Sequence, residues 1–165
     1  MYFCTILYLI FFNYSNFEVV KNNNLTSYKT DYYSAFSSTD TVQINKQIIQ
    51  ISNLQVTEKK AYIGALLMRK AGLVSSISSK LNLFLEGRKL LEFAISKDKQ
   101  NAEYRFLRLV IQENCPSILQ YYSKIKEDAL MIRTSFNAFT TEVKSAITNY
   151  SKTSESLKSE DLLKI

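Results

Sequence analysis

The sequence predicts an all-α domain, and three observations lead to this expectation. The chain of 165 residues contains only three glycines and one proline, whereas turn-rich β-sandwiches and barrels need more of both. Its apolar content of 46% is ordinary for a globular protein with a hydrophobic core. Apolar residues recur at spacings of three and four over long stretches, which is the periodicity of an amphipathic helix. We expect αα-hairpins in a helical array and a long C-terminal helical segment.

Residues 1–16 are expected to form a signal-like segment. Residues 2–12, YFCTILYLIFF, form an apolar run that is shorter than the roughly 20 residues needed to span a bilayer. Such a run is typical of the central region of a secretory signal, although no Lys or Arg precedes it. A buried N-terminal helix and an uncleaved membrane anchor remain as alternatives. A signal would place the protein in the periplasm or cell envelope; without one it would be cytoplasmic.

Residues 17–40 are rich in Asn, Ser, Thr and Tyr, and we expect a polar loop or disordered segment with at most a short helix at residues 32–36.

The next stretch, residues 41–56, fits two patterns. Ile44, Ile48 and Ile51 follow helical spacing, while shorter pairs alternate as in strands. Its length and the capping residues before it favour a helix, with a small hairpin as the alternative.

A clearer helix is expected at residues 58–71, followed by Gly72 as its stop. One edge of this helix carries mostly small side chains, namely Ala61, Gly64, Ala65 and Met68. A polar linker at residues 75–79 then leads to the stretch that organises the chain, residues 80–112.

Residues 80–112 are expected to form two helices joined by a polar turn at residues 97–101. The apolar face of the first helix consists of Leu83, Phe84, Gly87, Leu90, Leu91, Ala94 and Ile95. Gly87 interrupts this face with a residue that costs about 1 kcal/mol relative to alanine in a helix. We interpret it as a site of close helix packing, the alternative being a tolerated surface glycine.

The second helix is expected to be the central element of the domain, with Asn101 as its N-cap. It carries two apolar rows, one of Phe106, Leu109 and Val110 and the other of Tyr104, Leu107 and Ile111. A helix that is apolar over most of its circumference is covered on two sides. Only the stripe of Arg105, Arg108 and Gln112 is expected to remain exposed to water.

The junction of this pair resembles the junction between two tetratricopeptide repeats, which are helix-turn-helix units of about 34 residues. The resemblance rests on Ala94-Ile95-x-x-Asp98-x-x-Asn101-Ala102-Glu103, together with Gly87 and Leu91 at the small and large positions of the motif. Lys99 stands in place of the motif's proline, and no second full copy follows. The stretch is also similar to small helical proteins of bacteria. The resemblance implies an αα-hairpin fold and no particular activity.

The C-terminal segment, residues 118–150, has apolar residues at alternating spacings of four and three over nearly five heptads. Packing against the domain is the simplest interpretation, as one helix or as two with a break near Glu127-Asp128. Pairing of a protruding helix with another chain is the alternative. We expect residues 41–150 to form the helical domain and residues 151–165 a polar tail.

The sequence offers no catalytic or metal-binding constellation. It has no histidine, which excludes Ser-His-Asp and Cys-His catalysis and histidine-ligated metals. Its glycines form no phosphate-binding loop. Cys4 and Cys115 form no disulfide framework, and Cys115 is expected to be an inert thiol. We expect no enzymatic activity and no cofactor.

The expected function is non-enzymatic binding of a protein or peptide partner. Nucleic acid is a poor candidate, since the net charge of +6 is scattered along the chain, and membrane contact is expected only through an uncleaved N-terminal segment. The alternative is self-association through a helix spanning residues 118–150. The candidate site is a cationic patch that would bind a partner's carboxylate, consisting of Arg69, Arg88, Arg105, Arg108 and Gln112. The alternative is a structural set of salt bridges with Glu92, Glu103 or Glu113.

Overall fold

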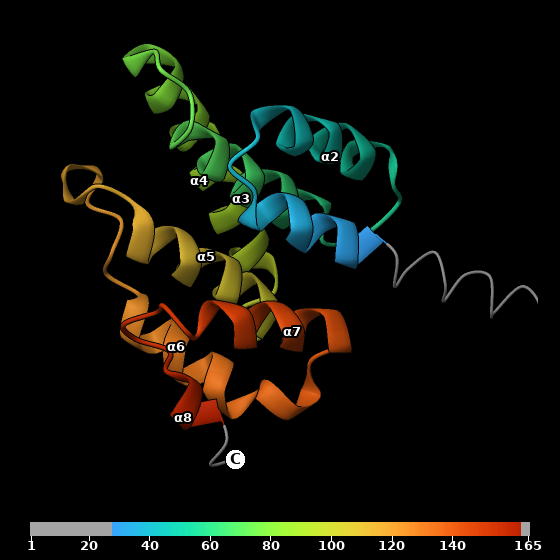
Figure 1. Ribbon diagram of the computed structural model, residues 1–165, viewed down its shortest axis with the longest axis vertical. Coiled ribbons are helices and arrows are strands. Elements are labelled where there is room, and N and C mark those ends of the chain that lie inside the picture. Colours follow the sequence, from blue (N-terminus) through green and yellow to red (C-terminus); the bar gives the residue numbers. More distant parts are fainter. Residues whose placement is uncertain (1–27, 163–165) are drawn as a thin grey trace, which may run out of the picture.

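The computed structural model describes residues 28–162, which form an array of helices without strands (Figure 1). This confirms the all-α prediction. The α-helices are residues 28–37, α2 (Thr41–Asn53), α3 (Lys59–Ala71), α4 (Ile77–Lys97), α5 (Ala102–Asn114), α6 (Ile125–Thr134), α7 (Thr141–Tyr150) and α8 (Ser159–Leu162). Short 3-10 helices lie at η1 (Ser117–Leu119) and η2 (Phe136–Ala138). The predicted signal-like segment, residues 1–16, lies outside the described residues.

The uncertain stretch after Asp40 is helical, so the hairpin alternative is wrong. The Asp40 carboxylate accepts a hydrogen bond from the Val42 backbone N–H at 2.8 Å and caps α2. Ile44 and Ile51 are buried on the inner face of this helix. The helical spacing of the isoleucines therefore decides the structure, and the helix ends at Asn53.

The helices α3 and α4 pack closely through two glycines, which confirms the prediction for Gly87. A Cβ atom built on Gly87 would lie 2.5 Å from the Gly64 carbonyl oxygen, and one on Gly64 would lie 2.6 Å from the Gly87 carbonyl oxygen. No side chain fits between the two backbones. Gly72 caps α3 as predicted, but with an ordinary φ of −68°.

The helix α5 is the central element, with α2, α3, α4 and residues 28–37 on one side and α6, α7 and α8 on the other (Figure 1). The Asn101 side chain accepts a hydrogen bond from Tyr104 N–H at 3.2 Å, as expected of an N-cap. Both apolar rows are buried, apart from the partly exposed Val110. The polar edge is buried as well: Arg105, Arg108 and Gln112 are only 7%, 3% and 4% exposed. The prediction that this edge faces water is wrong, because α6 covers it.

Residues 28–37 form a helix, which includes the short helix considered at residues 32–36 but is longer. The predicted polar loop is therefore wrong there. Tyr28, Tyr32 and Phe36 recur every four residues and place an aromatic stripe in the core. The Tyr32 ring stacks on the Tyr62 ring of α3 with 4.0 Å between centroids. Residues 17–27 lie outside the described residues.

The predicted C-terminal helical segment, residues 118–150, is not one helix. The chain turns at Gln120, whose φ of 47° is left-handed, and turns again between Ser135 and Thr140. Residues 127 and 128, where a break was expected, lie in the first turn of α6. The packing interpretation is confirmed, since the heptad positions Ala129, Ile132, Val143 and Ile147 are buried in the core.

The polar tail predicted at residues 151–165 is wrong for its described part. Ser151, Leu157 and Leu162 are buried, and α8 closes this segment against the domain. The domain therefore extends beyond the predicted range of residues 41–150 at both ends. Within residues 28–162, no helix combines the length and apolarity needed to cross a membrane.

Candidate functional site

Two of the five predicted site residues are held inside the domain by Asp128 of α6. The Arg108 guanidinium donates two hydrogen bonds to the two oxygens of the Asp128 carboxylate, each 2.7 Å long. Arg105 donates to the same carboxylate at 3.3 Å, and Asp128 is fully buried. A buried carboxylate needs such partners, because an unpaired charge is costly away from water. These arginines join α5 to α6 and do not face a partner.

The network continues toward the surface through Glu92 of α4. Its carboxylate accepts hydrogen bonds from Arg108 at 3.0 Å and from the Tyr121 hydroxyl at 2.6 Å. The Arg88 guanidinium lies over the Tyr121 ring, 4.8 Å from its centroid. Burial raises the pKa of the Tyr121 phenol, and the negative charge of Glu92 adds to this effect. Burial likewise raises the pKa of the Asp128 carboxyl, against the opposing effect of its hydrogen bond to Arg108.

The remaining two predicted residues do not join this network. Arg69 donates to the Phe36 carbonyl oxygen at 3.1 Å, on the other side of α5. The carbonyl oxygen of the Gln112 side chain is buried without a hydrogen-bond partner among the described residues. The predicted cationic patch is therefore not assembled. The alternative of structural salt bridges holds for Glu92, while Glu103 and Glu113 serve other partners.

Glu103 joins the helix 28–37 to α3 and α5. Its carboxylate accepts hydrogen bonds from Lys29 Nζ at 2.7 Å, from the Tyr33 hydroxyl at 2.8 Å, and from the Tyr62 hydroxyl. Burial raises the pKa values of both tyrosines well above the ordinary value. The function of this cluster is structural, because its groups are mutually satisfied and buried.

Glu113 has the same role at the C-terminal end of α5. It accepts hydrogen bonds from the Tyr150 hydroxyl at 2.6 Å, the Ser154 hydroxyl at 2.7 Å and the Ser156 backbone N–H at 2.9 Å. These bonds hold the residues after α7 against the central helix. Sequence reasoning missed them because partners about 40 positions apart leave no local pattern.

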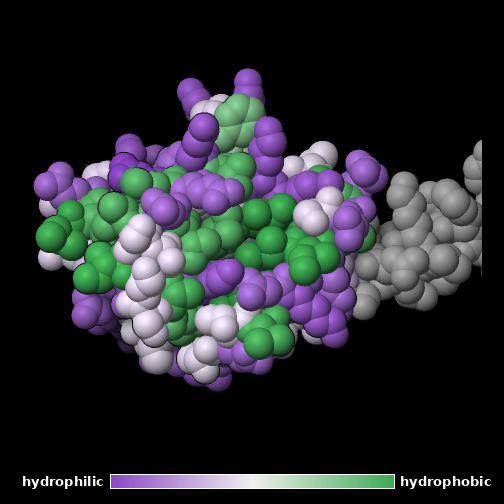
Figure 2. Space-filling model, turned by 90° about the horizontal axis from the view of Figure 1, so that it is seen from above, coloured by the Kyte–Doolittle hydropathy of each residue, from purple (hydrophilic) through white to green (hydrophobic). Residues whose placement is uncertain are grey.

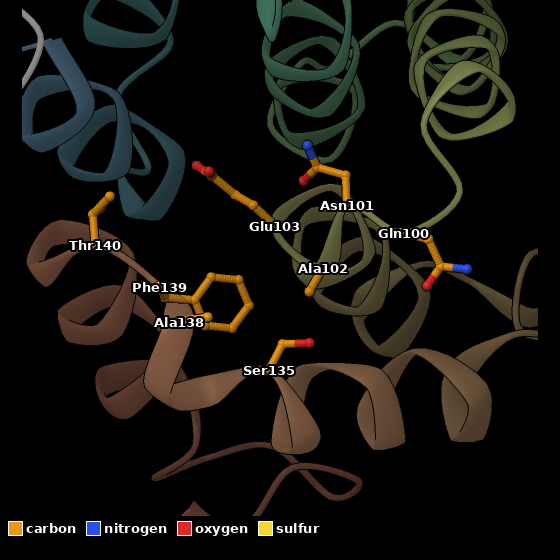
Figure 3. A pocket seen from close by; sticks show the side chains of 8 residues that line it. All are labelled: Gln100, Asn101, Ala102, Glu103, Ser135, Ala138, Phe139 and Thr140. Atoms are coloured by element: carbon orange, nitrogen blue, oxygen red, sulfur yellow. The ribbon is translucent and has the colours of Figure 1, made fainter.

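A small cleft of about 280 Å³ lies between the N-terminus of α5 and the residues around η2 (Figure 3). The Phe139 ring points into it, while the Glu103 side chain extends toward the helix 28–37, where its donors lie (Figure 3). The other lining side chains are uncharged. The cleft therefore presents no ionised group that is free to bind a ligand.

A second and larger hollow is a groove of about 1800 Å³, bounded by the helix 28–37, α3, α4, α5, η1 and α7. We call it the helical groove. Its apolar lining consists of Tyr33, Phe36, Met68, Ala71, Ile77, Leu81, Phe84, Phe106, Val110, Ile111, Ile118, Leu119, Ala146 and Tyr150. Figure 2 shows one face of the molecule, on which hydrophobic side chains form a band between hydrophilic ones.

The lining of the helical groove exposes large aliphatic side chains. Ile77 is 84% exposed, Ile118 86% and Leu81 46%, whereas Met68, Phe84 and Phe106, which line the same groove, are buried. Large side chains of this kind, gathered on one apolar surface, mark interaction sites more often than single exposed residues do. Sequence reasoning missed this surface because its residues come from six separate elements.

Cys115 also borders the groove, half buried. Its thiol makes weak contacts to the carbonyl oxygens of Gln112 and Tyr121, and burial raises its pKa. A raised pKa leaves the thiol protonated near neutral pH, which disfavours nucleophilic chemistry.

Within the described part of the chain, no group of His, Cys, Asp and Glu side chains could hold a metal ion. The feature that the described residues offer is an apolar surface with exposed aliphatic side chains. The chain matches no protein-family model, and comparison with curated proteins and with solved structures gave no match.

Proposed function

We propose that this protein is a non-enzymatic interaction module that binds a segment of a partner protein in the helical groove. The observation that carries the proposal is the groove itself, an apolar hollow on whose lining Ile77, Leu81 and Ile118 are exposed. At about 1800 Å³ the groove is larger than the roughly 300–1,000 Å³ of small-molecule sites. An elongated ligand such as a peptide segment fits that size.

The residues that stabilise the fold are different from the residues proposed to bind the partner. The buried carboxylates Glu103, Glu113 and Asp128 hold the helices together, and none of these clusters depends on the exposed aliphatic residues of the groove. A partner can therefore dock on a preformed surface, which lowers the ordering cost of binding.

The test is affinity capture from an extract of the source cells that includes the envelope fraction. The groove variants Leu81→Glu and Ile118→Glu are compared with Ile49→Glu on α2 and Leu130→Glu on α6, which are exposed aliphatic residues outside the groove. We expect one specific partner that is lost with the groove variants and retained with the control variants. Capture of nothing specific, or equal capture by all four variants, contradicts the proposal.

Export is part of the proposal if residues 1–16 act as a signal. The motivation is the apolar run of residues 2–12. Mass spectrometry of the mature N-terminus, combined with cell fractionation, tests it. A full-length chain in the cytoplasm contradicts it.

Self-association is the second candidate, in a changed form. The long helix on which it depended is absent, but Ile118 and Tyr122 of the predicted segment are exposed. Light scattering decides: a monomer at all concentrations eliminates this candidate, whereas a dimer that Ile118→Glu dissociates supports it.

A further inference from the structure

We infer that the partner segment is an amphipathic helix with an acidic polar face. This inference rests on the proposed function and specifies the chemistry of its ligand. It depends on the charges around the helical groove and on the helices that form its walls.

The charged residues that line the groove are mostly cationic. They are Arg69, Lys80, Lys144 and Lys152, against the single carboxylate of Glu142. The first two come from α3 and α4, while Lys144, Lys152 and Glu142 come from α7 and the residues directly after it. Positive charge therefore comes from two separate parts of the groove's wall.

These cations are available to a ligand. Among residues 28–162, none of the four forms an ion pair with a carboxylate. Lys144 and Lys152 donate to the uncharged oxygens of Asn137 and Asn149, at 2.8 and 3.3 Å. This contrasts with Arg105 and Arg108, whose charges are neutralised by buried acids. Carboxylates on a bound ligand could form ion pairs with these four groove cations, which form none within the described part of the chain.

The all-helical lining of the groove favours a bound helix over an added strand. Addition of a strand requires a sheet edge, and the described residues contain no strand. A helix about 10 Å wide presents an apolar stripe to a hydrophobic groove and keeps its polar side outward. The acidic residues of such a helix would flank its apolar stripe and meet the cations of the two walls.

An anionic membrane surface shares the charge of this ligand but does not fit the geometry. Peripheral binding to a bilayer uses a projecting apolar face that enters the lipid. Here the apolar residues line a hollow of about 1800 Å³ that helices bound on several sides. A flat lipid surface would contact only its most exposed side chains, Ile77, Leu81 and Ile118.

The test is a selection from a displayed library of random peptides of about 16 residues, long enough for about four helical turns. The full chain is the bait, and peptides that also bind the Leu81→Glu/Ile118→Glu variant are removed. We expect the surviving peptides to combine helical apolar spacing with an excess of Asp and Glu, and to bind more weakly as salt increases. In parallel, flotation with phosphatidylglycerol vesicles measures membrane binding.

A charge-reversed bait provides the matched control. Lys80→Glu/Lys152→Glu should lower the affinity for the selected peptides by about tenfold. Each substitution removes one exposed ion pair with a peptide carboxylate and replaces it with a repulsion. The variant Lys46→Glu/Lys126→Glu has the same net charge, but its exposed lysines lie outside the groove, so it should bind as the unmodified chain does.

The outcomes separate the two proposals. Groove-dependent peptides that are neutral or basic overturn this inference and leave the proposed function standing. Groove-dependent binding to vesicles in place of peptides overturns it as well. A selection that yields no groove-dependent peptide contradicts both.

Discussion

The two oxygens of the Asp128 carboxylate each accept a 2.7 Å hydrogen bond from the Arg108 guanidinium, in a place where both side chains are buried. The pair spans 20 residues of sequence and joins the central helix α5 to α6. Removing one partner of a buried ion pair leaves an uncompensated charge, which makes this contact a determinant of the fold.

Replacement of Asp128 should therefore destabilise the protein strongly. We expect Asp128→Ala to lower the free energy of unfolding by about 3–5 kcal/mol, measured by urea denaturation, because two guanidinium groups lose their buried charge partner and keep only the more exposed Glu92 and Glu127. Glu127→Ala is the control, since that neighbouring carboxylate is half exposed and should contribute less than about 1 kcal/mol. Equal losses for the two variants would contradict the account.

The stability losses caused by substitutions at Asp128 and Arg108 should also be non-additive. Residues in one buried network share their interaction energy, so Asp128→Ala/Arg108→Ala should lose less stability than the sum of the two single variants. A double-mutant cycle measures this coupling. Strict additivity would show that the two groups act independently.

The helix pair α3 and α4 should not tolerate a methyl group at their crossing. Gly87→Ala would place a Cβ 2.5 Å from the Gly64 carbonyl oxygen, so the backbones must separate. We expect a loss of about 1–3 kcal/mol from overpacking, larger than the helix-propensity gain of about 1 kcal/mol. Gly72→Ala is the control, because its Cβ would meet only the Arg69 carbonyl at 3.4 Å and should be tolerated. Thermal melts followed by circular dichroism distinguish the two; an unchanged melting temperature for Gly87→Ala would be the contrary result.

The hydrogen bond from Tyr33 to Glu103 should make the helix 28–37 part of the cooperative domain. Tyr33→Phe removes one donor to a buried carboxylate, and we expect a cost of about 1.5–3 kcal/mol. Tyr122→Phe, at an exposed tyrosine, should have no measurable effect. If the two variants unfold at the same denaturant concentration, the hydrogen bond from Tyr33 to Glu103 contributes nothing to stability.

Stability should decrease at alkaline pH. Burial raises the pKa values of Tyr33, Tyr62 and Tyr121 in the folded state, whereas unfolded tyrosines ionise near the ordinary pKa of about 10. These raised values contribute stability that is fully present below the unfolded pKa and is lost as the pH rises above it. Above about pH 10, each tyrosine that stays protonated in the folded state but ionises in the unfolded state lowers the free energy of unfolding by about 1.4 kcal/mol per pH unit. Denaturation midpoints measured between roughly pH 8 and pH 11 should decrease above pH 10, and less steeply in Tyr33→Phe; a flat profile would contradict the assignment.

Local patterns predict the helices well because each depends on residues close in sequence. The isoleucines of α2, the glycine of α4 and the two apolar rows of α5 all lie where helical spacing places them. The same spacing failed for residues 118–150, since periodicity records which residues are buried and is unaffected by the turns at Gln120 and Ser135. Only residues 32–36 of the helix 28–37 were considered helical, because its aromatic stripe is embedded in polar composition.

The candidate site was predicted less well, for a physical reason. Arginines on a mostly apolar helix can face either water or a buried acid, and the choice depends on Asp128, 20 positions beyond Arg108. The helical groove depends on six elements meeting in space, which no local spacing encodes. The residues that the proposals use, Ile77, Leu81 and Ile118, are ordinary aliphatics until the fold leaves them exposed.

The most direct measurement is hydrogen exchange on the full chain, with and without a bound partner or selected peptide. The account predicts that exchange slows in the segments that form the groove, around Ile77–Phe84 of α4, η1 and α7, and is unchanged in α2 and α6. Slower exchange confined to α2 or α6 would place the binding surface elsewhere and contradict the central claim.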